Sequence, residues 1–291
     1  MRLAQFLMLG AALALGACQS TDDTTAPSAG ETALQAAVSE PAAQAAPTAE
    51  NAIEAAMENP ARSEANKARD IWRHPAETLD FFGLKPGMTV VEISPGGGYY
   101  AEILARFAKE TGGTYVGTGK PVKAVADASV YGETTFTPFD AESGPLVEPG
   151  AADMVVTFRN IHNWMSREGM LDKAMADFAA ALKPGGVLGV VEHRADPRPE
   201  TVVDGVAARD GYVSTATVIL AAEKAGLVLE AESEINANPK DTKDHPFGVW
   251  TLPPVARTSP FGEPANPDFD RAPYDAIGES DRMTLRFRKP E

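Results

Sequence analysis

The chain has 291 residues, of which 44% are hydrophobic and 23% charged, and its formal net charge is -15. This composition is typical of a folded globular protein and excludes a wholly disordered or collagen-like chain. With 26 basic against 41 acidic residues, the protein has too few cations to coat nucleic acid, because such binding depends on neutralising phosphates. The single cysteine, Cys18, excludes a disulfide within the chain and any zinc site made of several thiolates.

The first 18 residues, MRLAQFLMLGAALALGAC, have the pattern of an export signal. Arg2 precedes a largely apolar run that is shorter than the ~20 residues of a membrane-spanning helix. The ending Leu-Gly-Ala-Cys resembles the lipobox of bacterial lipoproteins, which implies a lipid anchor on Cys18. Gln19 at the next position then implies the outer membrane, on its periplasmic side. A plain secretory signal with a chance cysteine is the alternative.

Residues 19–60 are rich in Ala, Thr, Pro, Glu and Gln and have almost no large apolar side chains. Such a segment cannot bury enough surface to offset the entropy lost on ordering. We therefore expect a disordered tether between the signal peptide, residues 1–18, and a single domain over residues 61–291, with transient helix in the Ala-rich patch around Ile53–Met57.

The remaining chain alternates helical stretches with short β-branched runs, which is typical of βαβ units around a parallel sheet. The string Leu-Lys-Pro-Gly occurs at 84–87 and at 182–185, and each copy is predicted to end a helix ahead of a strand. This order predicts a doubly wound sheet closed by an antiparallel hairpin. The predicted strands are 88–93, 114–117, 134–139, 153–158, 187–192, 227–233 and 282–288, and the longer predicted helices are 99–109, 167–182 and 215–225.

A Pro-rich stretch, residues 239–273, is too long for a simple connection between two elements. Two interpretations stay open for it. It is either a loop that covers the ligand site or a variable excursion without such a role.

The string VVEISPGGGYY, residues 90–100, places a glycine-rich turn between an apolar strand and a helix. Glycine there lets the backbone approach a ligand and adopt positive φ angles. A glycine turn alone is weak evidence, but the match extends along the chain. Over residues 63–291 the sequence resembles class I S-adenosylmethionine-dependent methyltransferases, and in particular a group of bacterial predicted methyltransferases with a WRHP segment. The other matching strings are RDIWRHPAETLDFFGLKPGM (69–88), FTPFDAES (136–143), DMVVTFRNIHNW (153–164), LKPGGVLGVVEHRA (182–195) and DRMTLRFRKP (281–290).

The resemblance implies a Rossmann-like sheet of seven strands, mostly parallel, with an antiparallel last strand and helices on both faces. It also implies S-adenosyl-L-methionine as cofactor and a small-molecule acceptor, which it does not identify.

The sequence departs from the family at two places. Ser94 replaces the family's usual first glycine, and Gly117-Thr118-Gly119 replaces the acid that normally binds the ribose hydroxyls. Loss of that charge-assisted bond, about 1.5–3 kcal/mol, predicts either weaker cofactor binding or a ligand other than the expected one. The implied cofactor-binding residues are Glu92, Ser94, Gly96, Gly98, Asp140 and Asn160.

Two histidines follow adjacent predicted strands, His162 after the fourth and His193 after the fifth. Both therefore belong on the rim where open α/β sheets bind ligands. An unperturbed histidine pKa near ~6.5 suits a general base at neutral pH, so His162 is the first catalytic candidate and His193 the reserve. The alternative for His162 is a hydrogen bond to a neighbouring loop. No His-x-x-x-His pair exists, so we predict no metal site.

Two functions remain open at this stage. The first is methyl transfer from S-adenosylmethionine to an unknown acceptor. The second is a non-catalytic ligand-binding protein that kept the fold, because export would separate the chain from cofactor made in the cytosol and a fold does not by itself imply a function.

Overall fold

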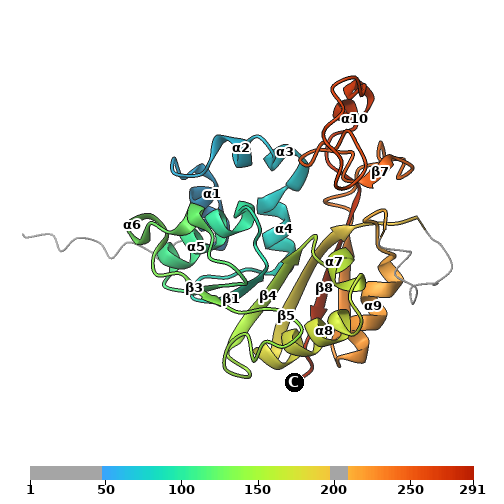
Figure 1. Cartoon of the computed structure of the whole chain (residues 1–291). Coiled ribbons are helices and arrows are strands. Elements are labelled where there is room, and N and C mark those ends of the chain that lie inside the picture. The colour runs from blue at the N-terminus through green and yellow to red at the C-terminus, as the bar shows by residue number, and fades with distance from the viewer. Residues whose placement is uncertain (1–47, 197–208) are drawn as a thin grey trace, which may run out of the picture. The chain divides into compact units, whose positions relative to one another are not determined.

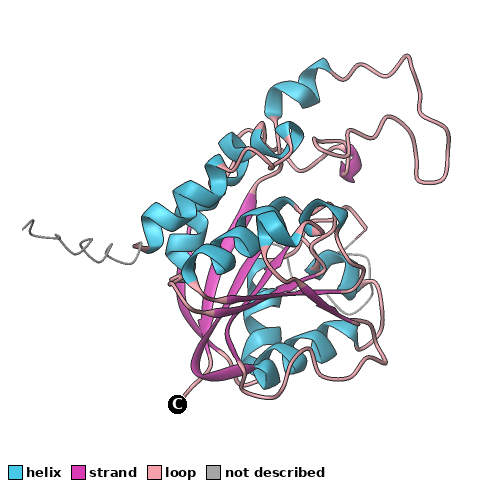
Figure 2. Cartoon of the chain, turned by 90° about the vertical axis from the view of Figure 1, so that its left-hand side faces the viewer, coloured by secondary structure: helices cyan, strands magenta, loops and turns pink. Residues whose placement is uncertain are grey.

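The computed structural model describes residues 48–196 and 209–291, which form a central sheet with helices on both faces (Figures 1 and 2). The strand order is β3-β2-β1-β4-β5-β8-β6, with β8 antiparallel to β5 and β6 and the other pairs parallel. The predicted Rossmann-like sheet of seven strands is therefore confirmed. Its strands are β1 (Thr89–Ile93), β2 (Thr114–Thr118), β3 (Thr135–Thr137), β4 (Ala152–Phe158), β5 (Leu182–His193), β6 (Val228–Ser233) and β8 (Arg282–Arg288).

Two hydrophobic clusters form the core, one on each face of the sheet. In α5, for example, Ile103, Leu104 and Phe107 are buried, as their helical spacing predicts. Among residues 48–196 and 209–291, no helix combines the length and the apolar character that crossing a membrane requires. The helices are α1 (Ala49–Glu58), α4 (Pro75–Phe82) and α5 (Tyr99–Thr111) on one face, α7 (Ile161–Met165), α8 (Met170–Ala181) and α9 (Thr215–Lys224) on the other, and the short α2 (Glu64–Lys67), α3 (Asp70–Arg73), α6 (Ala128–Tyr131) and α10 (Ala272–Ile277).

Helix α1 corrects the predicted tether. Residues 1–47, including the signal peptide and Cys18, lie outside the described residues, but Ala49–Glu58 is a helix that packs on α4 and α5. Thr48 begins it, because its hydroxyl accepts from the N–H of Asn51. Its buried face is mostly alanine, and small side chains allow close packing against the larger ones of α5. The rule that a segment without large apolar residues stays disordered was therefore wrong here.

The two Leu-Lys-Pro-Gly strings do not end helices, contrary to the prediction. Helix α4 already ends at Phe82, with Gly83 in the left-handed conformation as its C-cap. Helix α8 ends at Ala181, and β5 begins at Leu182 itself, so the second copy is part of the strand. There the N–H of Gly185 donates to the carbonyl of Lys289, beyond the end of β8.

The Pro-rich stretch contains β7 (Pro246–Val249), ends where α10 begins, and lies beyond the carboxyl ends of the parallel strands (Figure 1). Asp241 fixes its start, because this buried carboxylate accepts from the Tyr212 hydroxyl at 2.9 Å and from the N–H of Asp281 at 2.8 Å. His245 Nε2 lies 2.7 Å from the same carboxylate. The stretch is thereby tied to the beginning of β8, close to the edge of the sheet that binds ligands in this class of fold.

Candidate functional site

The turn between β1 and α5 forms a cavity that we call the glycine cavity. Ser94 has a φ of 48°, in the left-handed region that favours glycine, and its N–H donates to the hydroxyl of Thr118 at 2.9 Å. A Cβ added to Gly97 would meet no atom within 4 Å, so its backbone faces open space. The predicted residues Glu92, Ser94, Gly96 and Asn160 line this cavity together with Asn66, Arg69, Arg73, Ile93, Pro95, Gly97, Tyr99, Tyr100, Phe158 and Arg159.

Glu92 is buried at the end of β1, and its carboxylate accepts from the Tyr115 hydroxyl at 2.8 Å. Burial raises the pKa of Glu92 to about 8, against the opposing effect of that hydrogen bond. The side chain is therefore mostly protonated at neutral pH. Asn160 holds the ends of β1 and β4 together, because its amide donates to the carbonyl of Ile93 at 2.8 Å and to the Thr157 hydroxyl at 3.2 Å.

The structure places two predicted cofactor residues outside the glycine cavity. Gly98 begins α5 with a φ of 87°, and an added Cβ would lie 2.6 Å from Val122, so packing and backbone conformation require glycine there. Asp140 is exposed in a turn, where its carboxylate accepts from the N–H of Glu142 at 2.9 Å. Neither residue lines the cavity. A contact of either residue with a part of the cofactor outside this cavity stays a prediction.

A second cavity of about 100 Å³ lies at the ends of β4 and β5, and we call it the histidine cavity. It contains both predicted catalytic histidines, and the Pro-rich stretch forms its other wall. This favours the interpretation of that stretch as a covering loop. The lining residues are Arg159, His162, His193, Val249, Trp250, Leu252, Pro253, Pro254 and Val255.

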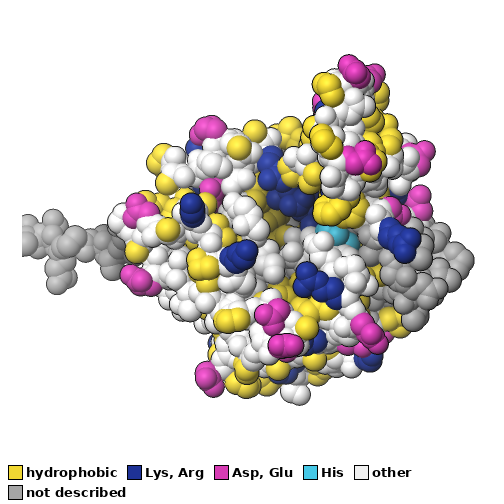
Figure 3. Space-filling view, viewed as in Figure 1, with side chains coloured by type: hydrophobic (Ala, Val, Ile, Leu, Met, Phe, Trp, Pro, Cys, Tyr) yellow, Lys and Arg dark blue, Asp and Glu magenta, His cyan; other side chains and the backbone are white. Residues whose placement is uncertain are grey.

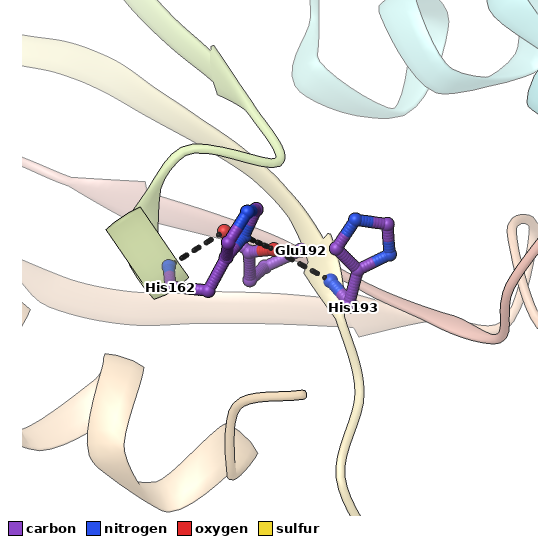
Figure 4. Close-up of side chains that lie close together, drawn as sticks. All are labelled: His162, Glu192 and His193. Carbon is purple, nitrogen blue, oxygen red and sulfur yellow. Dashed lines mark hydrogen bonds and ion pairs between the residues drawn. The ribbon is translucent and has the colours of Figure 1, made fainter. Parts of the chain in front are cut away.

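His162 stands over the carboxylate of Glu192, with His193 beside it (Figure 4). His162 Nδ1 lies 2.9 Å from Glu192 Oε1. A carboxylate only accepts hydrogen bonds, so Nδ1 carries the proton in the neutral ring and Nε2 keeps its lone pair. Backbone N–H groups hold the carboxylate in place, because those of Ile161 and His193 donate to its two oxygens at 2.6 and 2.8 Å. This arrangement leaves a base at Nε2.

The sequence did not identify Glu192 as the partner of His162, although its place at the end of β5 put it on the rim. His162, Glu192 and His193 offer three ligand-type atoms within 4.8 Å of one another, a grouping that spacing along the chain could not show. However, N–H groups already use both oxygens of Glu192. Burial is the main cause that holds the pKa of His193 well below its usual value, and the charge of Arg159 acts in the same direction. This positive charge also disfavours a metal cation. We therefore interpret the cluster as a proton-handling group.

Arginines line the glycine cavity and the wall between the two cavities. Basic side chains gather in a hollow of the surface next to the histidines (Figure 3). Arg159 lines both cavities. Arg69, Arg73 and Arg282 pair with a single buried carboxylate, Glu279. Arg159 was not among the residues predicted from the sequence. Its position in the string RNIH, directly after the fourth predicted strand, was the one feature of the sequence that could have placed it at the ligand-binding edge.

Comparison with known proteins gives a fold and no family. No protein-family profile matches the chain, and no curated protein matches its sequence. The three similar solved structures named below are at most 20% identical to this chain and superpose with TM-scores below 0.5, so the fold class rests on the strand order of the sheet. Similar solved structures include a SAM-dependent methyltransferase from Aquifex aeolicus (19% identity, 58% of this chain and 87% of that chain, TM-score 0.46), the [4+2]-cyclase SpnF (17%, 84% and 98%, 0.49) and phosphoethanolamine N-methyltransferase 2 of Haemonchus contortus in complex with S-adenosyl-L-methionine (20%, 76% and 53%, 0.45).

Proposed function

We propose that the domain binds S-adenosyl-L-methionine at the glycine cavity and methylates a small molecule held in the histidine cavity. The observation that carries the proposal is the pair of cavities at the carboxyl ends of β1, β4 and β5, which share Arg159 as a common wall. A glycine-rich turn that opens a helix lines the first cavity, and a histidine with an available lone pair lines the second. Ligands of open α/β sheets bind at this edge.

The residues present fit part of the cofactor well. Gly96 and Gly97 expose backbone to the cavity, and Arg69 and Arg73 complement a carboxylate such as that of its methionine end. The cavity measures about 130 Å³, below the roughly 300–1,000 Å³ of typical ligand sites, so the nucleoside end must lie outside it. At the end of β2 the buried Thr118 and the glycine Gly119 offer no carboxylate to the ribose. These features support binding with reduced affinity.

The chemistry assigned to the chain is proton removal and positioning. The cofactor supplies an electrophilic methyl group on a sulfonium. His162 Nε2 accepts the proton of an acceptor hydroxyl or amine, and Glu192 keeps the ring in the required tautomer. The covering loop, through Trp250 and its neighbours, excludes water from the histidine cavity.

Calorimetry of the full chain with S-adenosylmethionine and S-adenosylhomocysteine tests the binding step. Gly97→Val should abolish it, because Gly97 faces the cavity without a positive φ and a branched side chain would occupy ligand space. Gly144→Val is the matched control, since Gly144 is exposed, has open space around it and lies outside the cavity. Equal binding by both variants, or no binding by the wild type, contradicts the proposal.

The turnover step has its own test. We expect His162→Ala to lower methyl transfer about 10²–10⁴-fold while the Kd for S-adenosylhomocysteine stays unchanged. The assay follows radiolabelled methyl groups onto a panel of small carboxylates and phosphates. A mutant that keeps full turnover makes His162 a structural residue and moves the role of base to His193.

A non-catalytic ligand-binding protein is the second candidate, and the missing acid at Gly117-Thr118-Gly119 favours it. A methyl-transfer assay distinguishes the methyltransferase from the non-catalytic binding protein. A non-catalytic protein binds S-adenosylhomocysteine or a related nucleoside, yet shows no methyl transfer to any acceptor, including its own side chains.

We further propose that the protein is exported and held by lipid on Cys18 at the outer membrane, facing the periplasm. The Leu-Gly-Ala-Cys string after an apolar run supports this, and two or more acyl chains are needed for stable anchoring. Mass spectrometry of the membrane fraction should find an acylated N-terminal peptide that begins at Cys18. A native protein that begins upstream of Cys18, or one that is fully soluble, contradicts this.

A further inference from the structure

We propose that the methyl acceptor carries an oxyanion, a carboxylate or a phosphate, and that Arg159 binds this group at the wall between the two cavities. The statement that the bound molecule is a methyl acceptor rests on the proposed function. The oxyanion site itself does not depend on it, because it follows from the surroundings of one guanidinium.

Arg159 has no ion-pair partner of its own, and only the more distant Glu279 attracts it. Its Nε is buried with no hydrogen-bond partner, although the residue as a whole is partly exposed, and within residues 48–196 and 209–291 no carboxylate forms an ion pair with it. A buried and unsatisfied charged donor is costly, so proteins seldom keep one without a use. Burial and the charge of Arg73 lower the pKa of Arg159 to about 9, which still leaves the guanidinium protonated at neutral pH. It therefore presents a full positive charge.

The neighbouring arginines differ from Arg159 in this respect. Glu279 lies 2.7 Å from Arg69, 2.9 Å from Arg73 and 3.2 Å from Arg282. One carboxylate thus serves three guanidiniums, and Arg159 adds a fourth cation beside them. The cluster has a clear excess of positive charge in a chain whose net charge is -15. An anionic ligand would balance this excess, and a neutral or cationic ligand would not.

The backbone of Arg159 adds a second cost. Its φ is 61°, in the left-handed region, and its N–H donates to the carbonyl of Val191 at 2.8 Å. Strain of about 1–3 kcal/mol at a non-glycine residue is found mainly at functional sites. Here it turns the chain between β4 and α7, so that Arg159 and His162 line the same cavity. An oxyanion bound by Arg159 therefore belongs to a molecule that also reaches the proposed base.

Guanidinium geometry limits the chemistry of the ligand. The planar fork matches carboxylates and phosphates with two parallel hydrogen bonds. The histidine cavity, at about 100 Å³, admits a small molecule or the small end of a larger one. The proposed acceptor class is thus a small hydroxy or amino compound with a carboxylate or phosphate close to the group that is methylated.

The test uses thermal unfolding of the full chain in phosphate and in chloride at equal ionic strength. Phosphate should raise the Tm of the wild type by about 2–4 °C or more. Arg159→Met should keep only the general stabilisation that phosphate gives any folded protein, and so show a smaller shift than the wild type. In chloride its Tm should equal or exceed that of the wild type, because the unpaired charge and its cost are gone. Arg167→Met, an exposed arginine on the same β4–α8 connection, is the matched control and should keep the shift.

Arg159→Lys is a second variant, which keeps the positive charge but loses the planar guanidinium that forms two parallel hydrogen bonds. We expect a phosphate shift smaller than that of the wild type. The proposal is overturned if phosphate shifts Arg159→Met as much as the wild type. It is also overturned if Arg159→Met lowers the Tm in chloride by several degrees, since Arg159 would then be a structural residue.

A second arm separates the acceptor's oxyanion from the carboxylate of the cofactor. S-adenosylhomocysteine and 5′-methylthioadenosine, which lacks the carboxylate, are titrated into the wild type and into Arg159→Met. If the site serves the acceptor, neither affinity changes by more than about threefold between the two proteins, well under the tenfold that marks a lost interaction of about 1.4 kcal/mol. A tenfold loss confined to S-adenosylhomocysteine assigns Arg159 to the cofactor and overturns the proposal. If neither nucleoside binds while the phosphate shift depends on Arg159, the proposed function fails and the oxyanion site stands.

Discussion

His162 meets Glu192 across two neighbouring strands, with Nδ1 of the ring 2.9 Å from the carboxylate although 30 residues separate them along the chain. Parallel pairing of β4 with β5 brings the two strand ends together, and α7 then places the ring over Glu192. The carboxylate is itself fixed by backbone N–H groups from both sides. The imidazole is therefore held in one orientation and one tautomer before any ligand binds.

Replacing Glu192 by glutamine should reverse the tautomer of His162. The N–H of Ile161, at 2.6 Å, requires an oxygen at one end of the side chain, so the new amide turns its NH₂ group toward His162 Nδ1. That group donates, which forces the ring proton onto Nε2 and removes the base. Nitrogen NMR of the imidazole should show the Nδ1–H form in the wild type and the Nε2–H form in Glu192→Gln.

The same substitution should lower the free energy of unfolding by about 1–3 kcal/mol, because the N–H of His193 loses its acceptor. Glu168→Gln, at an exposed position, is the control and should change neither the tautomer nor the stability. An Nε2–H ring already present in the wild type would contradict the assignment of His162 as base.

Local patterns predicted the sheet well, because its strands are short apolar runs between clear turn signals. The glycine turn gave the position of the first cavity for the same reason, since Ser94, Gly96 and Gly97 act through local backbone geometry. Both histidines were placed on the correct edge, because a residue that follows a parallel strand can only lie at that edge.

What the sequence could not predict depends on partners far along the chain. Glu279 lies more than 200 residues from Arg69 and Arg73, and no local pattern connects them. Nothing in the sequence indicated that helix α1 is stable and packed, because alanine-rich faces bury surface only against larger side chains supplied by other helices. Asp140 lies in a turn after β3 that its own hydrogen bonds hold, and its predicted contact with the cofactor stays a prediction.

An acid placed at the end of β2 should strengthen cofactor binding. Gly119 has a φ of 81° and open space where a Cβ would stand, and aspartate is among the residues that tolerate this conformation. We expect Gly119→Asp to lower the Kd for S-adenosylhomocysteine about tenfold or more, since charge-assisted hydrogen bonds contribute about 1.5–3 kcal/mol. Gly119→Asn, without the charge, should give a smaller gain. Calorimetry that finds no difference between the three proteins would place the ribose elsewhere.

Glu92 should make the fold less stable as the pH rises. Its pKa is about 8 in the folded protein, against an ordinary value of 4.5 for a glutamate in the unfolded chain, so between these values the folded state binds a proton that the unfolded state has lost. The free energy of unfolding then falls with rising pH, by up to about 1.4 kcal/mol per unit from this group. Urea unfolding of the wild type and Glu92→Gln at pH 5 and pH 8 measures the difference. A constant difference would show that Glu92 ionises in the folded state as it does in the unfolded chain.

Glu279 should make the fold more stable as the pH rises, in contrast to Glu92, and over a lower pH range. Burial alone would raise its pKa, but the charges of Arg73 and Arg282 outweigh burial and lower it to about 2. A depressed folded-state pKa contributes stability that is fully present above the unfolded value of 4.5 and is lost as the pH falls from there toward 2. We expect Glu279→Gln to lower the free energy of unfolding at pH 7 by about 3–5 kcal/mol, because buried arginines lose their counter-charge.

This loss should shrink as the pH is lowered toward 2, where the wild-type carboxylate is itself protonated. A double variant carrying Arg159→Met as well should recover part of the loss, since it removes one of the cations that Glu279 balances. Urea unfolding of the single and double variants across this pH range measures both effects. If Glu279→Gln is as stable as the wild type at pH 7, the arginine cluster holds its charge without Glu279, and a counter-ion from solution must supply the balance.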